Sequence, residues 1–353
     1  MRGLSGPVRR VMGLKRIAGS SFPLAAFLVL IVLLAAAMLV VKRSFLVEAE
    51  TSFAELTFGG ELNIWSFADG TICAPKESPD LDATGDGPCN AMLYDVYVPK
   101  EARGDDVQYV LPEPNPVTLR WACGANVAVQ IDPDEALVMT VLGFDEVEAQ
   151  TPPCRGGDSR TFANGHDFGV GTIIVVPGEV WRKTGALPFQ AEVTLGEDIG
   201  PGSVHYLKQG RWEARQTSKA LELLGFTAVT EVVKTGAFSI GAEATIFDGN
   251  MQSVMFGQIT PVAIDWENAL PGFDVVMISA PGDTELRLAY FGFDAPVSIR
   301  PNWIDTVINS PTFLAIFTVL SLLAVLVQIF GAWLFGPAKE SKRAEEAGAA
   351  GED

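Results

Sequence analysis

The segment VVMISAPGDTELRLAY, residues 275–290, contains the clearest strand signal in the sequence. An apolar run from Val275 to Ser279 leads into the turn-forming residues Pro281 to Asp283, and apolar side chains then recur at every second residue from Leu286 to Tyr290. Two strand-like runs joined by a Pro and Gly turn are typical of a β-hairpin. This segment therefore predicts antiparallel β-structure in the second half of the chain.

Similar patterns recur throughout the region before this segment. Residues 56–64 predict a second hairpin, because apolar side chains alternate on both sides of Gly59 and Gly60. Short strands separated by Gly and Pro turns predict an all-β domain, either a sandwich or a jelly-roll-like barrel. Further strands are predicted at Val117–Trp121, Val127–Ile131, Thr172–Val176 and Ala191–Leu195, and a helix only at Gln216–Leu224.

Two long apolar segments flank the strand-rich region. Phe22 to Val41 contains no charged or polar side chain, and Phe313 to Phe335 contains only Thr318, Ser321 and Gln328 as polar members. A helix of about 20 apolar residues is long enough to cross a bilayer. A cleaved signal peptide is the alternative for the first segment, but its apolar run is too long and no small-x-small cleavage site follows it. We therefore predict two transmembrane α-helices.

Basic residues near the apolar segments predict their orientation. Arg and Lys residues precede the first segment, and Lys339, Lys342 and Arg343 follow the second, so both termini are expected in the cytoplasm. Lys42 and Arg43 oppose this orientation, but they are outnumbered and can snorkel to the headgroups. No N-x-[ST] glycosylation sequon is present, which favours a bacterial cytoplasmic (inner) membrane. The strand-rich region is then a periplasmic or extracellular ectodomain.

The predicted ectodomain is strongly acidic. The chain carries a net charge of −18, of which the first 43 residues contribute +7 and the tail after Gly336 contributes −2, so the region between them carries −23. Such a surface repels nucleic acid. Basic protein surfaces, divalent cations or a glycan are the expected ligands, in addition to the lipid bilayer.

The four cysteines, Cys73, Cys89, Cys123 and Cys154, all lie in the predicted ectodomain. An even number of cysteines in an oxidising compartment predicts disulfides. Metal binding is the alternative, but the chain has no CxxC pair and its histidines are not at zinc-like spacing. Closure of the shorter loops favours Cys73 with Cys89 and Cys123 with Cys154.

The loop from Thr151 to Arg160 is the best internal boundary, because it contains prolines and glycines and all four cysteines precede or lie within it. Residues 300–310 have apolar side chains at helical spacing, including Trp303, and resemble an interfacial helix. The predicted segments are a cytoplasmic basic arm (1–21), transmembrane helix 1 (22–41), a disulfide-stapled β unit (44–160), a cysteine-free β unit (161–299), an interfacial segment (300–310), transmembrane helix 2 (311–336) and a disordered cytoplasmic tail (337–353).

A possible cation-binding loop contains Asp80, Asp82 and Asp86. Its spacing does not match an EF-hand, because Thr84 stands at the fifth position, where that loop has Asp or Asn, and Ala91 stands at the twelfth, where it has a bidentate Glu. A solvated loop closed by a disulfide is the favoured interpretation, and no metal site is predicted.

No set of catalytic residues is recognisable. His166 and His205 are the only histidines, and neither lies beside a nucleophile motif. Asp265, Trp266 and Glu267 resemble a sugar-stacking platform, but strand alternation would place the aromatic ring and the two acids on opposite faces. We therefore expect no cofactor and, on balance, no enzymatic activity.

The second apolar segment has one face of small and polar residues, Ser321, Ala324, Gln328 and Gly331. Such a face allows close helix packing, either against the first apolar segment or against another membrane protein.

Two functions remain from the sequence alone. The first is a non-enzymatic scaffold, assembly or sensing component of a membrane complex, with another membrane or envelope protein as its partner. The second is a membrane-anchored carbohydrate-binding or carboxylate-dependent carbohydrate-active protein.

Overall fold

The computed structural model describes a β-rich region and a short C-terminal helical region. The described residues are 41–59, 63–78, 80, 89–97, 114–144, 161–163, 166–197, 206–218, 230–262, 271–290, 295–309, 314–315, 317–319, 321–322, 325–326 and 329. The chain divides into two compact units, one ending at Pro301 and the other beginning at Asn302.

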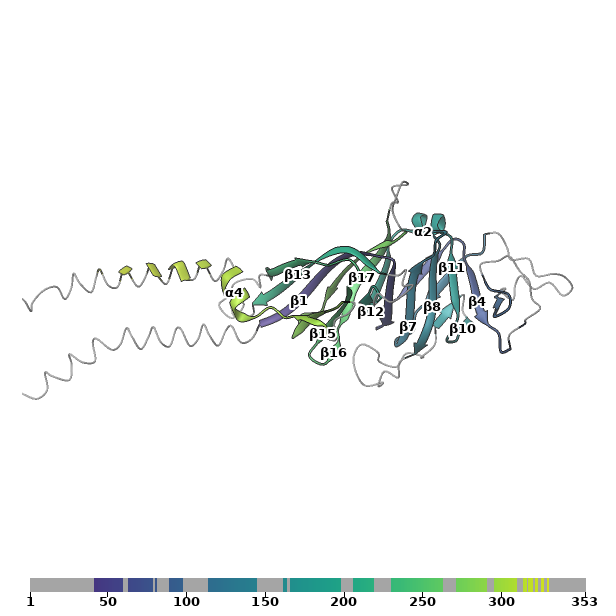
Figure 1. Ribbon diagram of the computed structural model, residues 1–353, viewed down its shortest axis with the longest axis horizontal. Helices are drawn as coiled ribbons and strands as arrows, with labels where there is room; N and C mark the ends of the chain where they lie inside the picture. Colours follow the sequence, from purple (N-terminus) through teal and green to yellow (C-terminus); the bar gives the residue numbers. More distant parts are fainter. Residues whose placement is uncertain are drawn as a thin grey trace, which may run out of the picture. The chain divides into compact units, whose positions relative to one another are not determined.

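Nearly all regular structure in the first unit is strand, as predicted, and every strand pair is antiparallel (Figure 1). The strands are β1 (Val41–Thr51), β2 (Phe53–Phe58), β3 (Ile64–Phe67), β4 (Thr71–Pro75), β5 (Tyr94–Val96), β6 (Val117–Arg120), β7 (Ala125–Ile131), β8 (Leu137–Phe144), β9 (Thr161–Ala163), β10 (His166–Phe168), β11 (Ile173–Val176), β12 (Leu187–Leu195), β13 (Leu207–Ser218), β14 (Thr230–Ala237), β15 (Glu243–Asp248), β16 (Met251–Gln252), β17 (Val254–Pro261), β18 (Phe273–Ser279), β19 (Thr284–Ala289) and β20 (Val297–Ile299).

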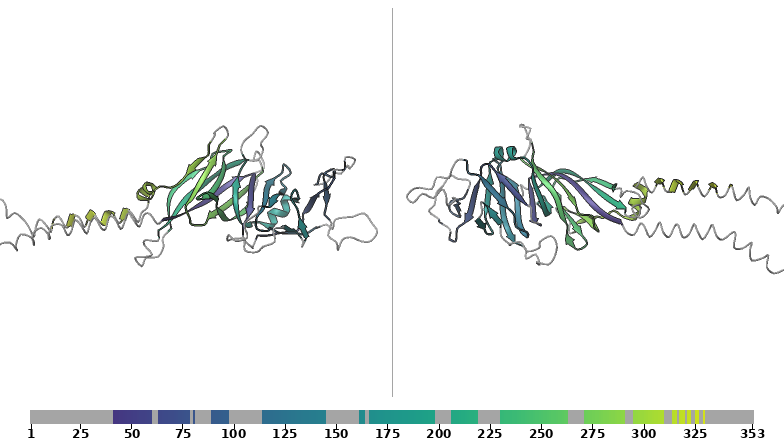
Figure 2. Two further views of the ribbon diagram at one scale, coloured as in Figure 1. Left: turned by 90° about the horizontal axis from the view of Figure 1, so that it is seen from below. Right: turned by 180° about the vertical axis from the view of Figure 1, so that it is seen from behind.

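The described strands form one large sheet and one small sheet. The large sheet follows the order β14-β13-β1-β18-β17-β12-β2-β7-β8-β11-β4-β5, and β15, β16, β19 and β20 join it off this path. The small sheet has the order β10-β9-β6-β3. Figure 2 shows the strands around β1 and the strands around β8 as two neighbouring groups. Pairing of β12 with β2 joins the two groups.

The core follows from strand alternation. In β12 every second side chain from Leu187 to Leu195 is buried, and in β18 Phe273, Val275 and Met277 are buried while the residues between them are exposed. Side chains of a strand alternate between its two faces, so each of these strands covers the core with one face. Strands from both sides of the predicted boundary at residue 160 share the large sheet, since β11 pairs with β8. The boundary loop itself lies outside the described residues, and the division stays a prediction.

Both predicted hairpins are wrong, although their strands are present. β18 pairs with β1 and β17, whereas β19 pairs with β15 and β20. Similarly, β2 pairs with β12 and β7, whereas β3 belongs to the small sheet. Between β2 and β3, the Asn63 side chain donates to the Gly59 carbonyl at 3.2 Å and accepts from the Gln190 N–H at 2.8 Å, which directs the chain away from a hairpin. Alternation predicts the buried face of a strand but not its neighbour.

The helix predicted at Gln216–Leu224 is also wrong where the structure describes it. Residues 216–218 extend β13, and Gln216 pairs with Arg43 of β1 and Glu231 of β14. Strand pairing on both sides of β13 therefore overrides the local helical pattern. Residues 219–224 lie outside the described residues.

One helix, α2 (Gly178–Thr184), was not predicted. Pro177 precedes it with φ −54°, and Gly185 ends it with φ 83° while donating its N–H to the Trp181 carbonyl. Pro at the start and Gly just past the end are favourable for helix boundaries. Trp181 is the one buried residue of this helix.

The predicted disulfide between Cys73 and Cys89 is present, with a Cα–Cα distance of 5.7 Å. It connects β4 to the turn before β5. Cys123 is also disulfide-bonded. Its predicted partner, Cys154, lies outside the described residues.

The second unit contains α4 (Trp303–Asn309), a helix within the predicted interfacial segment. The described residues between 314 and 329 are helical. Among the described residues, no helix has both the length and the hydropathy needed to span a membrane. The first predicted span lies outside the described residues except for Val41, where β1 begins.

Candidate functional site

The predicted cation loop is only partly described. The N–H of Asp80 donates to the Met92 carbonyl at 2.8 Å, and Asp82 and Asp86 lie outside the described residues. No group of three potential metal ligands occurs within the described part of the chain.

The residues weighed for catalysis are not brought together in the described structure. His166 begins β10 and pairs with Ala163 of β9, but its side chain is not described. His205 and Asp265 to Glu267 lie outside the described residues.

Four tryptophans of the first unit are buried: Trp65, Trp121, Trp181 and Trp212. Trp121 stacks on Phe58 with ring centroids 5.2 Å apart, and Trp65 meets both rings edge-on at 5.5 Å. Such contacts stabilise a core. These four rings are therefore unavailable for stacking against a sugar.

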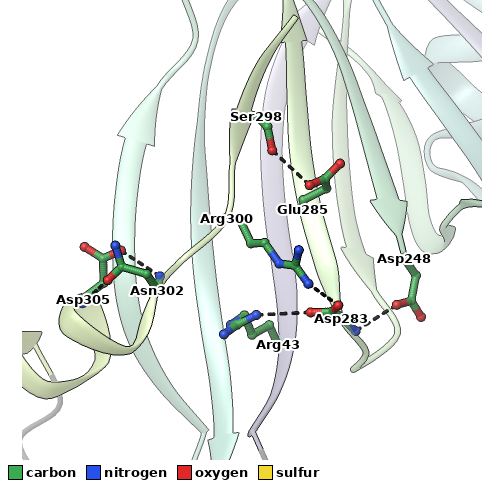
Figure 3. Close-up of polar contacts among 8 residues, drawn as sticks. All are labelled: Arg43, Asp248, Asp283, Glu285, Ser298, Arg300, Asn302 and Asp305. Atoms are coloured by element: carbon green, nitrogen blue, oxygen red, sulfur yellow. Dashed lines mark hydrogen bonds and ion pairs between the residues drawn. The ribbon is translucent and has the colours of Figure 1, made fainter. Parts of the chain in front are cut away.

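A charged cluster connects the two ends of the first unit. Arg43 lies near the start of β1, and Arg300 follows β20, so 257 residues separate them in sequence. Both guanidinium groups bind the carboxylate of Asp283, Arg43 through Nη1 at 3.3 Å (Figure 3). We call Arg43, Asp248, Asp283 and Arg300 the Asp283 cluster.

Backbone hydrogen bonds fix the same position. The N–H of Arg43 donates to the Gly282 carbonyl at 2.9 Å, and the N–H of Gly282 donates to the Arg43 carbonyl at 2.8 Å. Asp248 accepts the N–H of Asp283 at 2.8 Å. A Cβ at Gly282 would meet the Asp248 carboxylate, so a larger residue here would displace that side chain. The β18–β19 turn therefore holds the start of β1 by main-chain and side-chain bonds.

The charges of the cluster reinforce one another. The hydrogen bond to Asp283 is the main cause that raises the pKa of Arg300, ahead of burial, which lowers it. Burial alone would raise the pKa of Glu285, but hydrogen bonds from Arg287 and Ser298 and the charges of Arg287 and Arg300 together lower it. The Glu285 carboxylate therefore stays ionised at neutral pH.

A second ionic group lies at the other end of β1. Lys208 binds Glu50 at 3.2 Å, and Gln209 donates to the same carboxylate at 2.7 Å. Asp274 pairs directly with Glu50 across β1 and β18. Burial and then the nearby charge of Glu50 raise the pKa of Asp274, while Lys208 lowers it.

The predicted helix-packing face is mostly outside the described residues. Ser321 is helical and exposed, and Ala324, Gln328 and Gly331 are not described. Nearby, the Thr318 hydroxyl donates to the Leu314 carbonyl at 2.7 Å, a bond that satisfies this polar side chain within its own helix.

Sequence reasoning missed the Asp283 cluster as a site. It placed Arg43 at the lipid headgroups and gave Arg300 no role beyond being the first residue of the predicted interfacial segment. The turn around Gly282 was recognised, but nothing in the sequence pattern links that turn to the start of β1.

No protein-family model, curated protein or solved structure matches the chain. Its function therefore has to be inferred from its own residues.

Proposed function

We propose that this chain is a two-span envelope protein of the bacterial cytoplasmic membrane, and that its acidic β-rich ectodomain is a non-enzymatic scaffold, assembly or sensing component of a membrane complex. The Asp283 cluster carries this proposal. Arg43 follows the apolar segment 22–41, and Arg300 precedes the apolar segment 311–336. Because both arginines bind one carboxylate, both ends of the β-rich unit are held together. This arrangement suits a domain anchored at both ends to one membrane.

Exposed apolar side chains support a lipid environment for the C-terminal segment. Exposing this much apolar surface to water is unfavourable, and the hydrocarbon of a bilayer would cover it. The helical residues concerned are Leu314, Phe317, Val319, Leu322, Val325, Leu326 and Ile329, with exposed fractions between 41% and 63%.

The helix α4 supports an interfacial segment just before that region. Asn302 caps its start, since its Oδ1 accepts the N–H groups of Ile304 and Asp305, and Asp305 in turn accepts the Asn302 N–H (Figure 3). This is a reciprocal capping arrangement. Ile304 and Ile308 lie one helical turn apart and are 45% and 61% exposed. They give α4 an apolar face suited to the membrane surface.

The acidic charge and the buried tryptophans favour a protein partner. A net charge of −23 in the ectodomain attracts basic surfaces and repels nucleic acid. A sugar-stacking surface would need exposed aromatic rings, and the four described tryptophans of the first unit are in the core. No observation in the described residues favours the carbohydrate alternative.

The proposal is tested by labelling and purification of the full chain expressed in a bacterial host. Single cysteines are introduced by Ser5→Cys, Glu197→Cys and Ser341→Cys, and intact spheroplasts are treated with a membrane-impermeant maleimide. We expect labelling of only the Glu197→Cys variant, while the unmodified chain gives the background. Affinity purification from detergent-solubilised membranes should recover a second envelope protein. Labelling of the terminal cysteines, or recovery of the chain alone after cross-linking, would refute the proposal.

A further inference from the structure

A groove in the first unit, remote in sequence from the Asp283 cluster, has the features of a docking surface. Its volume is about 710 Å³, and it lies along β8, β11 and the first residue of β4, beside the start of α2. The turn from Asp132 to Ala136, between β7 and β8, forms one rim, and Glu179 of α2 lies on another side. Figure 1 shows α2 beside the ends of β8 and β11.

The floor of the groove is aliphatic. Val175 pairs with Val138 of β8 on one side and with Thr71 of β4 on the other, and Ile173 lies two residues before Val175 on the same face of β11. The alternate residues of β11, Ile174 and Val176, are buried in the core. The floor is therefore the outer face of the sheet, and its side chains are only half-buried.

The rim of the groove is acidic, and some of its carboxylates make no close ion pair or hydrogen bond with the described residues. Asp132 accepts the Ala136 N–H at 2.7 Å and so holds the turn. Arg182, the cation that lines the groove, is paired with Glu135 at 2.7 Å. Asp134 is exposed and has no partner among the described residues. Within the described part of the chain, Glu179 reaches only Lys183 at 4.0 Å, with both side chains more than 70% exposed. Two carboxylates are thus available to a ligand.

The groove is held in a fixed shape. Glu135 has a positive φ of 64°, which a non-glycine residue adopts only where the surrounding structure imposes it. A Cβ at Gly178 would meet the Glu135 carbonyl, so α2 packs directly on the β7–β8 turn. Trp181 anchors α2 in the core. A preformed groove loses little freedom on binding.

We infer that this groove binds an extended, cationic and partly aliphatic segment of a partner protein. Lys or Arg side chains of the segment lie beside Asp134 and Glu179, and alternate apolar side chains cover Val138, Ile173 and Val175. An extended segment fits because its side chains alternate between two opposite faces, so that one face covers the floor while long Lys or Arg side chains of the other face bend toward the carboxylates of the rim. The inference rests on the proposed scaffold function and specifies the kind of partner that such a scaffold would bind.

The probe is the fluorescein-labelled peptide acetyl-KVKVKVK-amide, titrated against the full chain in non-ionic detergent and followed by fluorescence anisotropy. Low salt, about 50 mM, keeps surface charges active. We expect saturable binding to the wild type, weaker binding of KGKGKGK and no binding of EVEVEVE. The double variant Asp134→Asn/Glu179→Gln should raise the Kd by at least roughly tenfold.

A matched control separates the groove from the general acidity of the ectodomain. Glu77→Gln/Glu197→Gln removes two other exposed acids, which follow β4 and β12 and do not line the groove. This control should change the Kd by less than about twofold. Val175→Thr, which keeps the size and makes the floor polar, should also weaken binding. Circular dichroism of every variant checks the fold.

Two results would overturn the inference. One is the absence of saturable binding by the wild type, and the other is equal loss of binding in the groove and control variants. The membrane labelling described above is independent of this assay. If the peptide bound the groove but the maleimide did not label the Glu197→Cys variant in spheroplasts, the inference about the groove would stand. Only the proposed function would then be refuted.

Discussion

At the scale of single residues, Trp65 and Trp121 differ in one bond. Both rings are 1% exposed and pack against Phe58. The indole N–H of Trp65 donates to the Pro188 carbonyl at 2.7 Å, whereas the buried Nε1 of Trp121 has no hydrogen-bond partner among the residues that the structure describes. Trp65 thus connects β3 of the small sheet to β12 of the large sheet.

This difference predicts unequal costs for the same substitution. Trp65→Phe and Trp121→Phe remove a similar apolar area, but only the first breaks a hydrogen bond to a main-chain carbonyl. A buried polar group left without its partner costs about 1–3 kcal/mol, so Trp65→Phe should lower the free energy of unfolding by roughly that much more. Urea unfolding of the full chain in detergent, followed by far-UV circular dichroism, measures both. If both substitutions lowered the free energy of unfolding equally, the hydrogen bond from Trp65 to the Pro188 carbonyl would not contribute to stability.

At the scale of elements, the pairing of β1 with β18 places Glu50 directly opposite Asp274. Directly opposed like charges destabilise a sheet by roughly 0.2–1 kcal/mol. Asp274→Asn should therefore raise the free energy of unfolding at pH 7, toward the lower end of that range because Asp274 is exposed.

The pH dependence of this gain has a definite sign. Because the pKa of Asp274 is raised in the folded state, its carboxylate disfavours folding at neutral pH, and protonation removes that penalty as pH falls through the folded pKa. The stability gained by Asp274→Asn should therefore disappear in acid, below the ordinary pKa of 3.8 that this carboxyl has in the unfolded chain.

Glu285→Gln is a control in which the effect on stability should have the opposite sign. The pKa of Glu285 is lowered, so its contribution to stability is present above 4.5 and is lost as pH falls. The measurement is the free energy of unfolding of both variants at a series of pH values. If both variants changed it with the same sign at neutral pH, the assigned directions of the two pKa shifts would be wrong.

The same elements show how far the sequence can predict this fold. Alternation located β2, β3, β6, β7, β12 and β19, because a buried face imposes a period of two on the residues themselves, and continuous apolar runs located β11 and β18. It did not predict that β18 and β19 pair with different strands, because the choice of neighbour depends on residues such as Arg43, which lies 239 positions before Gly282. The helix α2 was missed because its seven residues are too few to show a period.

The candidate sites were less predictable than the strands. The groove takes Thr71, Asp134 and Glu179 from three separate segments, and none of these residues has a distinctive local motif. The Asp283 cluster likewise joins residues from both ends of the unit. Only composition, through the acidic charge, indicated the kind of partner that the groove fits.

At the scale of the whole molecule, the Asp283 cluster makes the two ends of the β-rich unit depend on each other. If the chain moves at Arg300, its ion pair with Asp283 moves the β18–β19 turn. The hydrogen bonds between Gly282 of this turn and Arg43 then move the start of β1. Strand β1 pairs with both β13 and β18, so it lies inside the large sheet. A displacement at either end of the β-rich unit would therefore reach β1 inside the large sheet.

Asp283→Ala tests this dependence. Two exposed ion pairs together contribute roughly 1 kcal/mol. Amide protection at Arg43, which donates to Gly282, and at the β19–β20 pair should therefore fall together by about fivefold in native-state hydrogen exchange. The control is Glu48→Ala, which breaks the exposed pair between Glu48 of β1 and Arg211 of β13 at 2.6 Å. It should affect only the β1–β13 pair. If Asp283→Ala loosened one end and left the other protected, the two ends of the β-rich unit would be independent, and this cluster would not couple them.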